Sequence, residues 1–200
     1  MLTIQDDMKS YLAFSRYIDA DEPSIQRKAK ELKASAGCEI ELAKATYYFV
    51  RDEIKHSWDV QDKRVTVTAS DTLREGVGIC WAKANLLAAL LRANGIPSGI
   101  CYQRLTLGDT PESGYCIHAL NAIFLKSIGK WIRVDARGNK DGIHAGFSID
   151  EEHLAFPIRE EYDEIDYKVV YAEPISKTMD ILENSTDAIY MYLHSLPERI

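Results

Sequence analysis

The apolar residues of this 200-residue chain change their spacing about midway along the sequence. In the first half they recur at every third or fourth position, for example within 39–55 and 80–93, which predicts helices. In the second half they alternate with polar residues, which predicts strands over 98–107, 116–125 and 131–134. Helices that precede a hairpin-connected sheet indicate the α+β class with an antiparallel sheet, because parallel strands need long crossovers between them.

The patterns toward the two ends are shorter. Near the N-terminus, a helix is predicted over 25–36, because Gly37 follows its last helical position. Beyond the sheet, we expect helices over 149–156 and 175–194 and a strand over 167–172. No internal repeat or linker-like tract divides the chain, so we expect a single domain.

Composition excludes several classes of partner. A chain of this length with 46% hydrophobic residues can bury a hydrophobic core without disulfides or structural metal ions. Lys and Arg number 24 and Asp and Glu 31, a net charge of −7, and no stretch is densely basic, so we expect no nucleic-acid partner. No run of eighteen apolar residues predicts a membrane span, and the first ten residues lack the pattern of a secretory signal. We therefore expect a cytoplasmic protein with no membrane partner.

The four cysteines are Cys38, Cys80, Cys101 and Cys116. No two of them form a Cys-x-x-Cys pair, so we expect neither a structural zinc site nor another metal or cofactor. In a reducing compartment we expect no disulfides, and most of these side chains then serve as small buried hydrophobic groups. Cys116 shares the strand face of His118 and either lines a site or packs in the core.

Three segments carry residue types that catalyse acyl transfer. Cys80 follows Gly78-Ile79 at a predicted helix start, where the helix dipole favours a thiolate and free N–H groups point outward. His118 opens a strand and Asp135 ends the next one, so a hairpin turn near 127–130 brings the two together. A thiolate, a base and a carboxylate that orients the base form the set used in nucleophilic acyl chemistry. Taken singly, each is more often a core or turn residue.

The region around Cys80 resembles the transglutaminase-like superfamily. Members of that family show Gly-x-Cys at a helix start, a Leu-rich helix and then Gly-Ile-Pro. These elements match 78–80, 86–91 and 95–97 of this chain. The dipeptide Cys80-Trp81 is similar to the active-site dipeptide of animal transglutaminases.

The resemblance continues into the predicted sheet. A His-Ala pair that opens a strand matches His118-Ala119, and a Gly-Trp hairpin ending in Asp matches 129–135, with one residue inserted before the Trp. Leu120 stands where the family often has an aromatic residue, and Ala136-Arg137 follows the Asp in place of a Pro-Thr type of pair. The resemblance covers about residues 17–140, so we expect one domain over 1–200 with that core and a C-terminal addition over about 141–200.

The resemblance implies a papain-like α+β fold and assigns roles to the three residues. Cys80 would be the nucleophile, His118 the general base and then acid, and Asp135 the residue that orients His118. The backbone N–H of Cys80 would contribute to the oxyanion hole, the set of donors that binds the negatively charged oxygen. A second donor would come from an upstream side chain, for which Trp58 and His56 are candidates.

Further residues are expected beside the substrate. Trp81 adjoins the nucleophile, and Arg137, Asn139 and His144 follow Asp135 in a predicted loop. Of these, Trp81 and Asn139, with Trp58, are the substrate-binding or oxyanion candidates.

The function that follows is a cysteine-dependent acyl-transfer enzyme acting on a peptide, protein or small amide through a thioester on Cys80. Hydrolysis is expected over protein cross-linking, by analogy with the family. Two alternatives stay open. One is a peptide-binding module that keeps the fold without turnover, and the other is acyl transfer to an amine, for which dependence on acetyl-CoA would be diagnostic.

Overall fold

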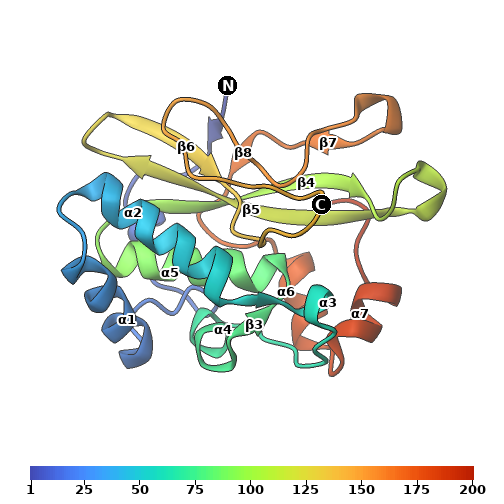
Figure 1. Ribbon diagram of the computed structural model, residues 1–200, viewed down its shortest axis with the longest axis horizontal. Coiled ribbons are helices and arrows are strands. Elements are labelled where there is room, and N and C mark those ends of the chain that lie inside the picture. Colours follow the sequence, from blue (N-terminus) through green and yellow to red (C-terminus); the bar gives the residue numbers. More distant parts are fainter.

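The computed structural model describes residues 1–200 and packs a layer of helices against one face of a curled antiparallel sheet (Figure 1). The order of strands in this sheet is β6-β5-β4-β7, and all its pairs are antiparallel. Two short parallel pairs, β1 with β8 and β2 with β3, lie outside it. The strands are β1 (Thr3–Ile4), β2 (Lys55–His56), β3 (Val77–Gly78), β4 (Ser98–Thr106), β5 (Tyr115–Leu125), β6 (Lys130–Val134), β7 (Ile165–Asp166) and β8 (Val169–Val170).

Most helices precede the sheet in the sequence, as the apolar spacing predicts. Short 3₁₀ turns occupy Ser10–Leu12, Pro111–Ser113 and Glu160–Tyr162, and a π-helical turn over Phe49–Glu53 extends α2. The α-helices are α1 (Pro23–Ala34), α2 (Glu39–Tyr48), α3 (Ser57–Val60), α4 (Ala69–Glu75), α5 (Cys80–Ala93), α6 (Ser176–Glu183) and α7 (Ala188–His194).

Helix α5 forms the centre of the molecule. It lies between the sheet and the outer helices, where it contacts β4 and β5 on one side and α1, α2 and α4 on the other (Figure 1). Every residue from Trp81 to Arg92 is buried, and four leucines of this helix are fully enclosed. A helix that is apolar on most of its circumference needs partners all round, which explains its central place. The first turn of α5 is thereby held rigidly at one edge of the core.

The opposite face of the sheet is covered by the N-terminal segment and β8. Tyr11 is fully buried there, and its hydroxyl donates a hydrogen bond to the backbone oxygen of Val170 (2.8 Å). A Cβ atom at Gly99 of β4 would lie 2.8 Å from the backbone oxygen of Tyr171, so only glycine allows this close approach. The N-terminal segment and β8 thus cover this face of the sheet together.

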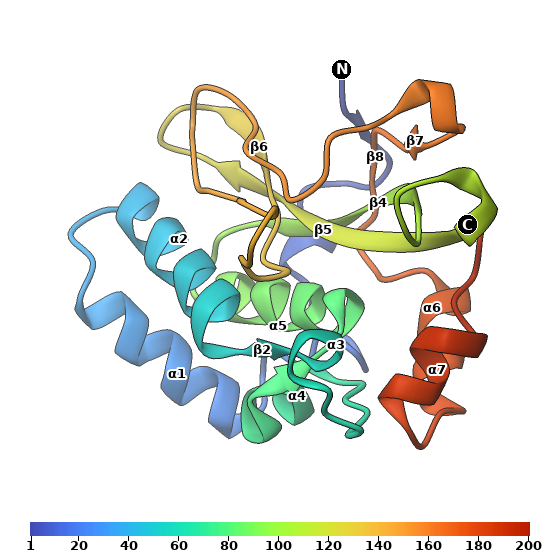
Figure 2. The same ribbon diagram turned by 45° about the vertical axis from the view of Figure 1, so that its right-hand side comes forward.

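The predicted helix over 149–156 is wrong: this segment is an irregular loop beside β5 and β6 (Figure 2). Its contacts with the sheet replace helical hydrogen bonds. Arg133 of β6 is buried and forms paired hydrogen bonds with Glu152 (2.7 and 2.6 Å) and Asp166 (2.6 and 2.8 Å). The backbone N–H of Ala155 donates to Asp135 (3.2 Å). These charged contacts fix the segment in an extended path that a helix could not follow.

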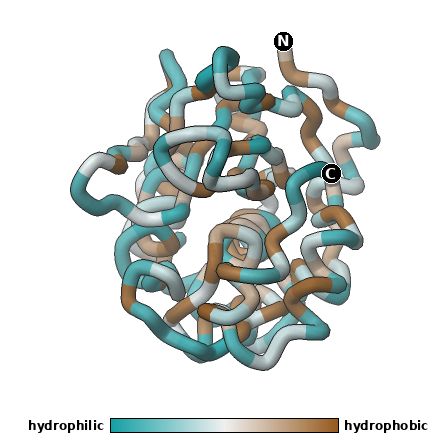
Figure 3. Tube along the Cα trace, turned by 90° about the vertical axis from the view of Figure 1, so that its right-hand side faces the viewer, coloured by the Kyte–Doolittle hydropathy of each residue, from teal (hydrophilic) through white to brown (hydrophobic).

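The predicted helix over 175–194 is two helices, α6 and α7. They separate at 184–187, where the Asp187 carboxylate accepts hydrogen bonds from the N–H groups of Ile189 (2.9 Å) and Tyr190 (3.0 Å) and so begins α7. Helix α7 packs beside α3, on the side of the molecule that faces the viewer in Figure 3, where the outer loops are largely hydrophilic. No helix has both the length and the apolar character required to cross a membrane.

Candidate active site

Cys80 is the first residue of α5, directly after β3. Ile79 precedes the helix in an extended conformation and provides no side-chain cap, so the first N–H groups of α5 stay available. A Cβ atom at Gly78 would lie 2.8 Å from Oγ1 of Thr66 and 3.1 Å from Cβ of Ala82. Glycine at this position therefore allows the strand to enter the helix closely, and it places the half-buried Cys80 thiol at the helix N-terminus.

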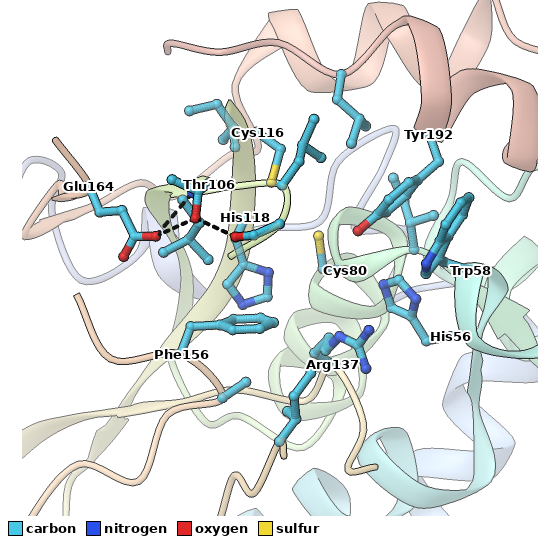
Figure 4. A pocket seen from close by; sticks show the side chains of 18 of the residues that line it. His56, Trp58, Cys80, Thr106, Cys116, His118, Arg137, Phe156, Glu164 and Tyr192 are labelled. Atoms are coloured by element: carbon cyan, nitrogen blue, oxygen red, sulfur yellow. Dashed lines mark hydrogen bonds between the residues drawn. The ribbon is translucent and has the colours of Figure 1, made fainter. Parts of the chain in front are cut away.

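The thiol faces a cavity of about 480 Å³ (Figure 4). The helical half of the molecule contributes His56, Trp58 and Cys80 to its wall, and the sheet contributes Cys116 and His118. The remainder of the wall comes from the chain after the sheet, with Arg137, Phe156, Arg159, Glu164 and Tyr192 among its residues. The predicted nucleophile and the predicted base thus share one pocket.

His118 and Asp135 form a buried pair. Nε2 of His118 lies 2.7 Å from Oδ2 of Asp135, and both residues are buried. The Asp135 carboxylate also accepts hydrogen bonds from the N–H groups of Arg137 (3.1 Å) and Ala155 (3.2 Å). Because Asp135 accepts at every contact, Nε2 is the donor, and Nδ1 of His118 is the ring nitrogen left for the thiol.

In the His118–Asp135 pair, each residue stabilises the charged form of the other. Burial lowers the pKa of His118, but the carboxylate of Asp135, followed by Cys80, outweighs burial and raises that pKa to about 10. Burial raises the pKa of Asp135, but His118 outweighs it and the net shift is downward. The pair is therefore an imidazolium beside a carboxylate at neutral pH. No hydrogen bond of ordinary geometry joins Cys80 to His118, although Cys80 contributes to the raised pKa.

Phe156 closes one side of the pair. Its ring meets the His118 ring edge to face, with the centroids 5.1 Å apart and an angle of 83° between the planes. This contact helps to hold the orientation of the imidazole. Phe156 comes from the loop that the sequence analysis expects to be helical, so its place beside His118 was not predicted.

His56 lies on the opposite side of Cys80 from His118 (Figure 4). It ends β2, where it pairs in register with Gly78 of β3. Burial, followed by the positive charge of Arg137, holds the pKa of His56 well below its usual value. His56 is therefore neutral at pH 7, and its Nδ1 is buried without a hydrogen-bond partner.

Tyr192 lines the cavity, although the sequence predicts only that it lies in a helix. Its ring stacks on Trp58 with the centroids 4.3 Å apart and 15° between the planes. Figure 4 shows its hydroxyl directed into the cavity toward Cys80. No local signal marks Tyr192, because its position depends on how α7 packs against α3.

The other residues that the sequence predicts beside the substrate have no free polar group in the cavity or lie outside it. Trp81 lines the cavity, as predicted, but it is only 1% exposed, and its Nε1 donates to the backbone oxygen of Ile117 (2.8 Å), so its N–H is already used in anchoring α5 to β5. The amide of Asn139 bonds both the N–H (2.8 Å) and the backbone oxygen (3.2 Å) of Ala145, which closes its own loop, and Asn139 does not line the cavity. His144 is exposed and also lies outside the wall.

Two further side chains complete the wall near the thiol. Burial raises the pKa of Cys116 to about 12, so this second thiol is protonated at neutral pH. Arg137 pairs with both carboxylate oxygens of Asp59 (2.5 and 2.8 Å), which fixes its guanidinium at the cavity edge. No group of three or more His, Cys, Asp or Glu side chains is arranged to hold a metal ion.

The helix-borne cysteine beside a strand-borne histidine, on an α+β fold with an antiparallel sheet, is the arrangement of papain-like cysteine-type enzymes. The chain belongs to the transglutaminase-like superfamily, whose family model matches residues 26–136. The matched residues include Cys80, His118 and Asp135. The predicted family and fold class are thereby confirmed.

Solved structures with this fold include a proposed cysteine protease from Cytophaga hutchinsonii, with 23% sequence identity and a TM-score of 0.53. That alignment covers 66% of this chain and 43% of the other, so the chain spans less than half the length of this relative. The periplasmic domain of TgpA from Pseudomonas aeruginosa is 19% identical, with a TM-score of 0.46 and coverage of 66% and 48%. No curated protein sequence matches the chain.

Proposed function

We propose that the protein is a cysteine-dependent acyl-transfer enzyme that acts on a peptide or amide carbonyl. Cys80 is the nucleophile, His118 exchanges protons with the reacting groups, and Asp135 orients and charges His118. The observation that carries the proposal is the hydrogen bond from Nε2 of His118 to Asp135 (2.7 Å), which leaves Nδ1 for the neighbouring Cys80 in the cavity.

The raised pKa of His118 determines the order of proton transfers. At neutral pH the ring is an imidazolium, so His118 already carries the proton that the leaving group needs, and its positive charge attracts negative charge on the attacking sulfur. The thiolate attacks the carbonyl carbon and forms the C–S bond, and the π electrons move to the oxygen. When the tetrahedral intermediate collapses, the C–N bond breaks and His118 gives its proton to the departing amine. A thioester remains on Cys80, and His118 is neutral.

Water resolves the thioester in a hydrolase. The neutral His118 removes a proton from the attacking water, the C–S bond breaks, and the carboxylic acid leaves. We favour hydrolysis over cross-linking because water needs no acceptor site of its own, whereas an amine acceptor needs a second subsite. The substrate class is a peptide, a protein or a small amide, which is consistent with the description of the similar Cytophaga hutchinsonii protein as a proposed cysteine protease.

The test uses p-nitrophenyl acetate, a small activated ester that acylates reactive thiols. We expect release of nitrophenol and the mass of one acetyl group on Cys80, and we expect neither in the Cys80→Ala variant. An intact protein that forms no adduct would instead be a binding module. A requirement for acetyl-CoA in place of the ester would favour the amine acyltransferase.

A further inference from the structure

The Tyr192 side chain combines a fixed ring with a free hydroxyl. The ring is half-buried and held flat against Trp58. The hydroxyl has no hydrogen-bond partner in the protein and points into the cavity toward Cys80 (Figure 4). Polar groups held in a cavity without a protein partner are available for a ligand. The place of this hydroxyl is the region where the carbonyl of a substrate would meet the thiol.

Cys80 and Tyr192 are close enough to influence each other. Burial, as the main cause, raises the pKa of the Tyr192 phenol above its ordinary value. Tyr192 therefore keeps its proton at neutral pH and can donate a hydrogen bond throughout a catalytic cycle.

The two upstream candidates for a second oxyanion donor fit this role less well. His56 lines the cavity, but its Nδ1 has almost no accessible surface and no hydrogen-bond partner. Trp58 presents its ring face to Tyr192, and its indole nitrogen lies beside His56 in Figure 4. The Tyr192 hydroxyl is the donor directed at Cys80.

We propose that the hydroxyl of Tyr192 is the second donor of the oxyanion hole, paired with the backbone N–H of Cys80, and that Trp58 positions its ring. The inference rests on the acyl-transfer function proposed above. During attack, the C–S bond forms and the electron pair of the carbonyl moves to oxygen. Tyr192 and the N–H of Cys80 donate hydrogen bonds to this oxyanion, and no proton leaves the phenol. When the tetrahedral intermediate collapses, its oxygen becomes the neutral carbonyl oxygen of the thioester. Both donors then hydrogen-bond to this carbonyl oxygen.

Two one-step probes of Cys80 separate this role from a structural one. Acylation by p-nitrophenyl acetate passes through an oxyanion, whereas alkylation by iodoacetamide does not. Tyr192→Phe keeps the ring stacked on Trp58 and removes only the hydroxyl. We expect its acylation rate constant to fall about 100-fold, as for other single donors, while alkylation changes less than about two-fold.

Tyr190→Phe is the matched control, because Tyr190 lies on the same helix and is 63% exposed. We expect it to leave both rates unchanged. Trp58→Leu should slow acylation more than alkylation, since the phenol loses its stacking partner. The inference would be overturned if Tyr192→Phe were acylated as fast as the wild type or faster, or if its acylation and alkylation rates fell equally. Any of these results would leave the proposed function standing. A wild-type protein that is alkylated at Cys80 but never acylated would overturn the proposed function, and this inference with it.

Discussion

Two regions of the chain, residues 26–136 and residues 137–200, contribute different kinds of residue to one cavity. The first region matches the family model and contains Cys80, His118 and Asp135. The second region contributes 11 of the 24 residues that line the cavity, among them Phe156 and Tyr192. The reactive groups therefore come from the part shared with the family, and nearly half of the wall comes from the part beyond it.

The two regions are also held by different forces. Helix α5 and strand β5 are fixed by apolar packing and by nine residue pairs with β4. The segment over 138–164 is fixed by individual polar contacts, such as Arg133 with Glu152 and Asp135 with Ala155. Packing over many residues tolerates sequence change in any one of them, whereas a wall held by single contacts can change shape with few substitutions. From this difference we propose that the first region determines the reaction and that the second region determines the choice of substrate.

The largest expected effect is at the nucleophile. Cys80→Ser should lower ester turnover by at least about 10⁴-fold, because a hydroxyl does not become the anion that attacks. Cys116→Ser is the matched control, since Cys116 lines the same cavity, and it should keep most of the activity. Initial rates with p-nitrophenyl acetate measure both. A Cys80→Ser variant that keeps as much activity as Cys116→Ser would mean that the chemistry does not depend on Cys80.

Asp135→Asn should lower turnover by about 10³-fold, because the amide neither stabilises the positive charge of His118 nor orients its ring as the carboxylate does. The pKa of His118 should fall below about 10, since burial lowers it and the opposing carboxylate is gone. Turnover follows from initial rates, and the pKa from the ring proton resonances of His118 in an NMR titration. An unchanged His118 titration in this variant would show that the pair does not set the charge of the base.

The raised pKa of His118 predicts a stability that depends on pH. Its folded value is about 10 and its ordinary unfolded value about 6.5, so its contribution is complete below pH 6.5 and is lost as the pH rises through 10. We expect the free energy of unfolding to drop between pH 6.5 and 10 by at least about 1.4 kcal/mol more in the wild type than in His118→Gln. Urea unfolding at several pH values measures this difference. The variant serves as the reference because Lys83, whose pKa is lowered to about 7 mainly by burial, contributes in the opposite sense to both proteins.

The smallest expected effect concerns the wall. Phe156→Leu should lower turnover by about 10-fold or less, because the His118 ring loses its edge-to-face contact but keeps Asp135. Its effect should differ between ester substrates of different acyl size, whereas that of Asp135→Asn should be uniform. Turnover of p-nitrophenyl acetate and p-nitrophenyl butyrate by both variants tests this. A uniform loss in Phe156→Leu would contradict the separation of reaction and selectivity.

The same division explains what the sequence predicts. The positions of Cys80, His118 and Asp135 follow from a helix start and a hairpin, which are local features with clear signals. The apolar spacing within 80–93 likewise predicts the helix α5, but not that it is buried on nearly all sides. The path of 149–156 has no local signal, because it depends on a buried arginine in a distant strand. Tyr192 is equally hidden, since its role arises from the docking of one short helix on another.

The central claim is that His118 and Asp135 make Cys80 a reactive nucleophile. The most direct measurement compares the iodoacetamide alkylation rates of Cys80 and the exposed Cys38 in the same protein at pH 7, followed by mass spectrometry of peptides. We predict that Cys80 reacts at least about ten times faster although it is less exposed, and that His118→Ala removes the difference. Alkylation of Cys80 no faster than that of Cys38 in the native protein would contradict the account.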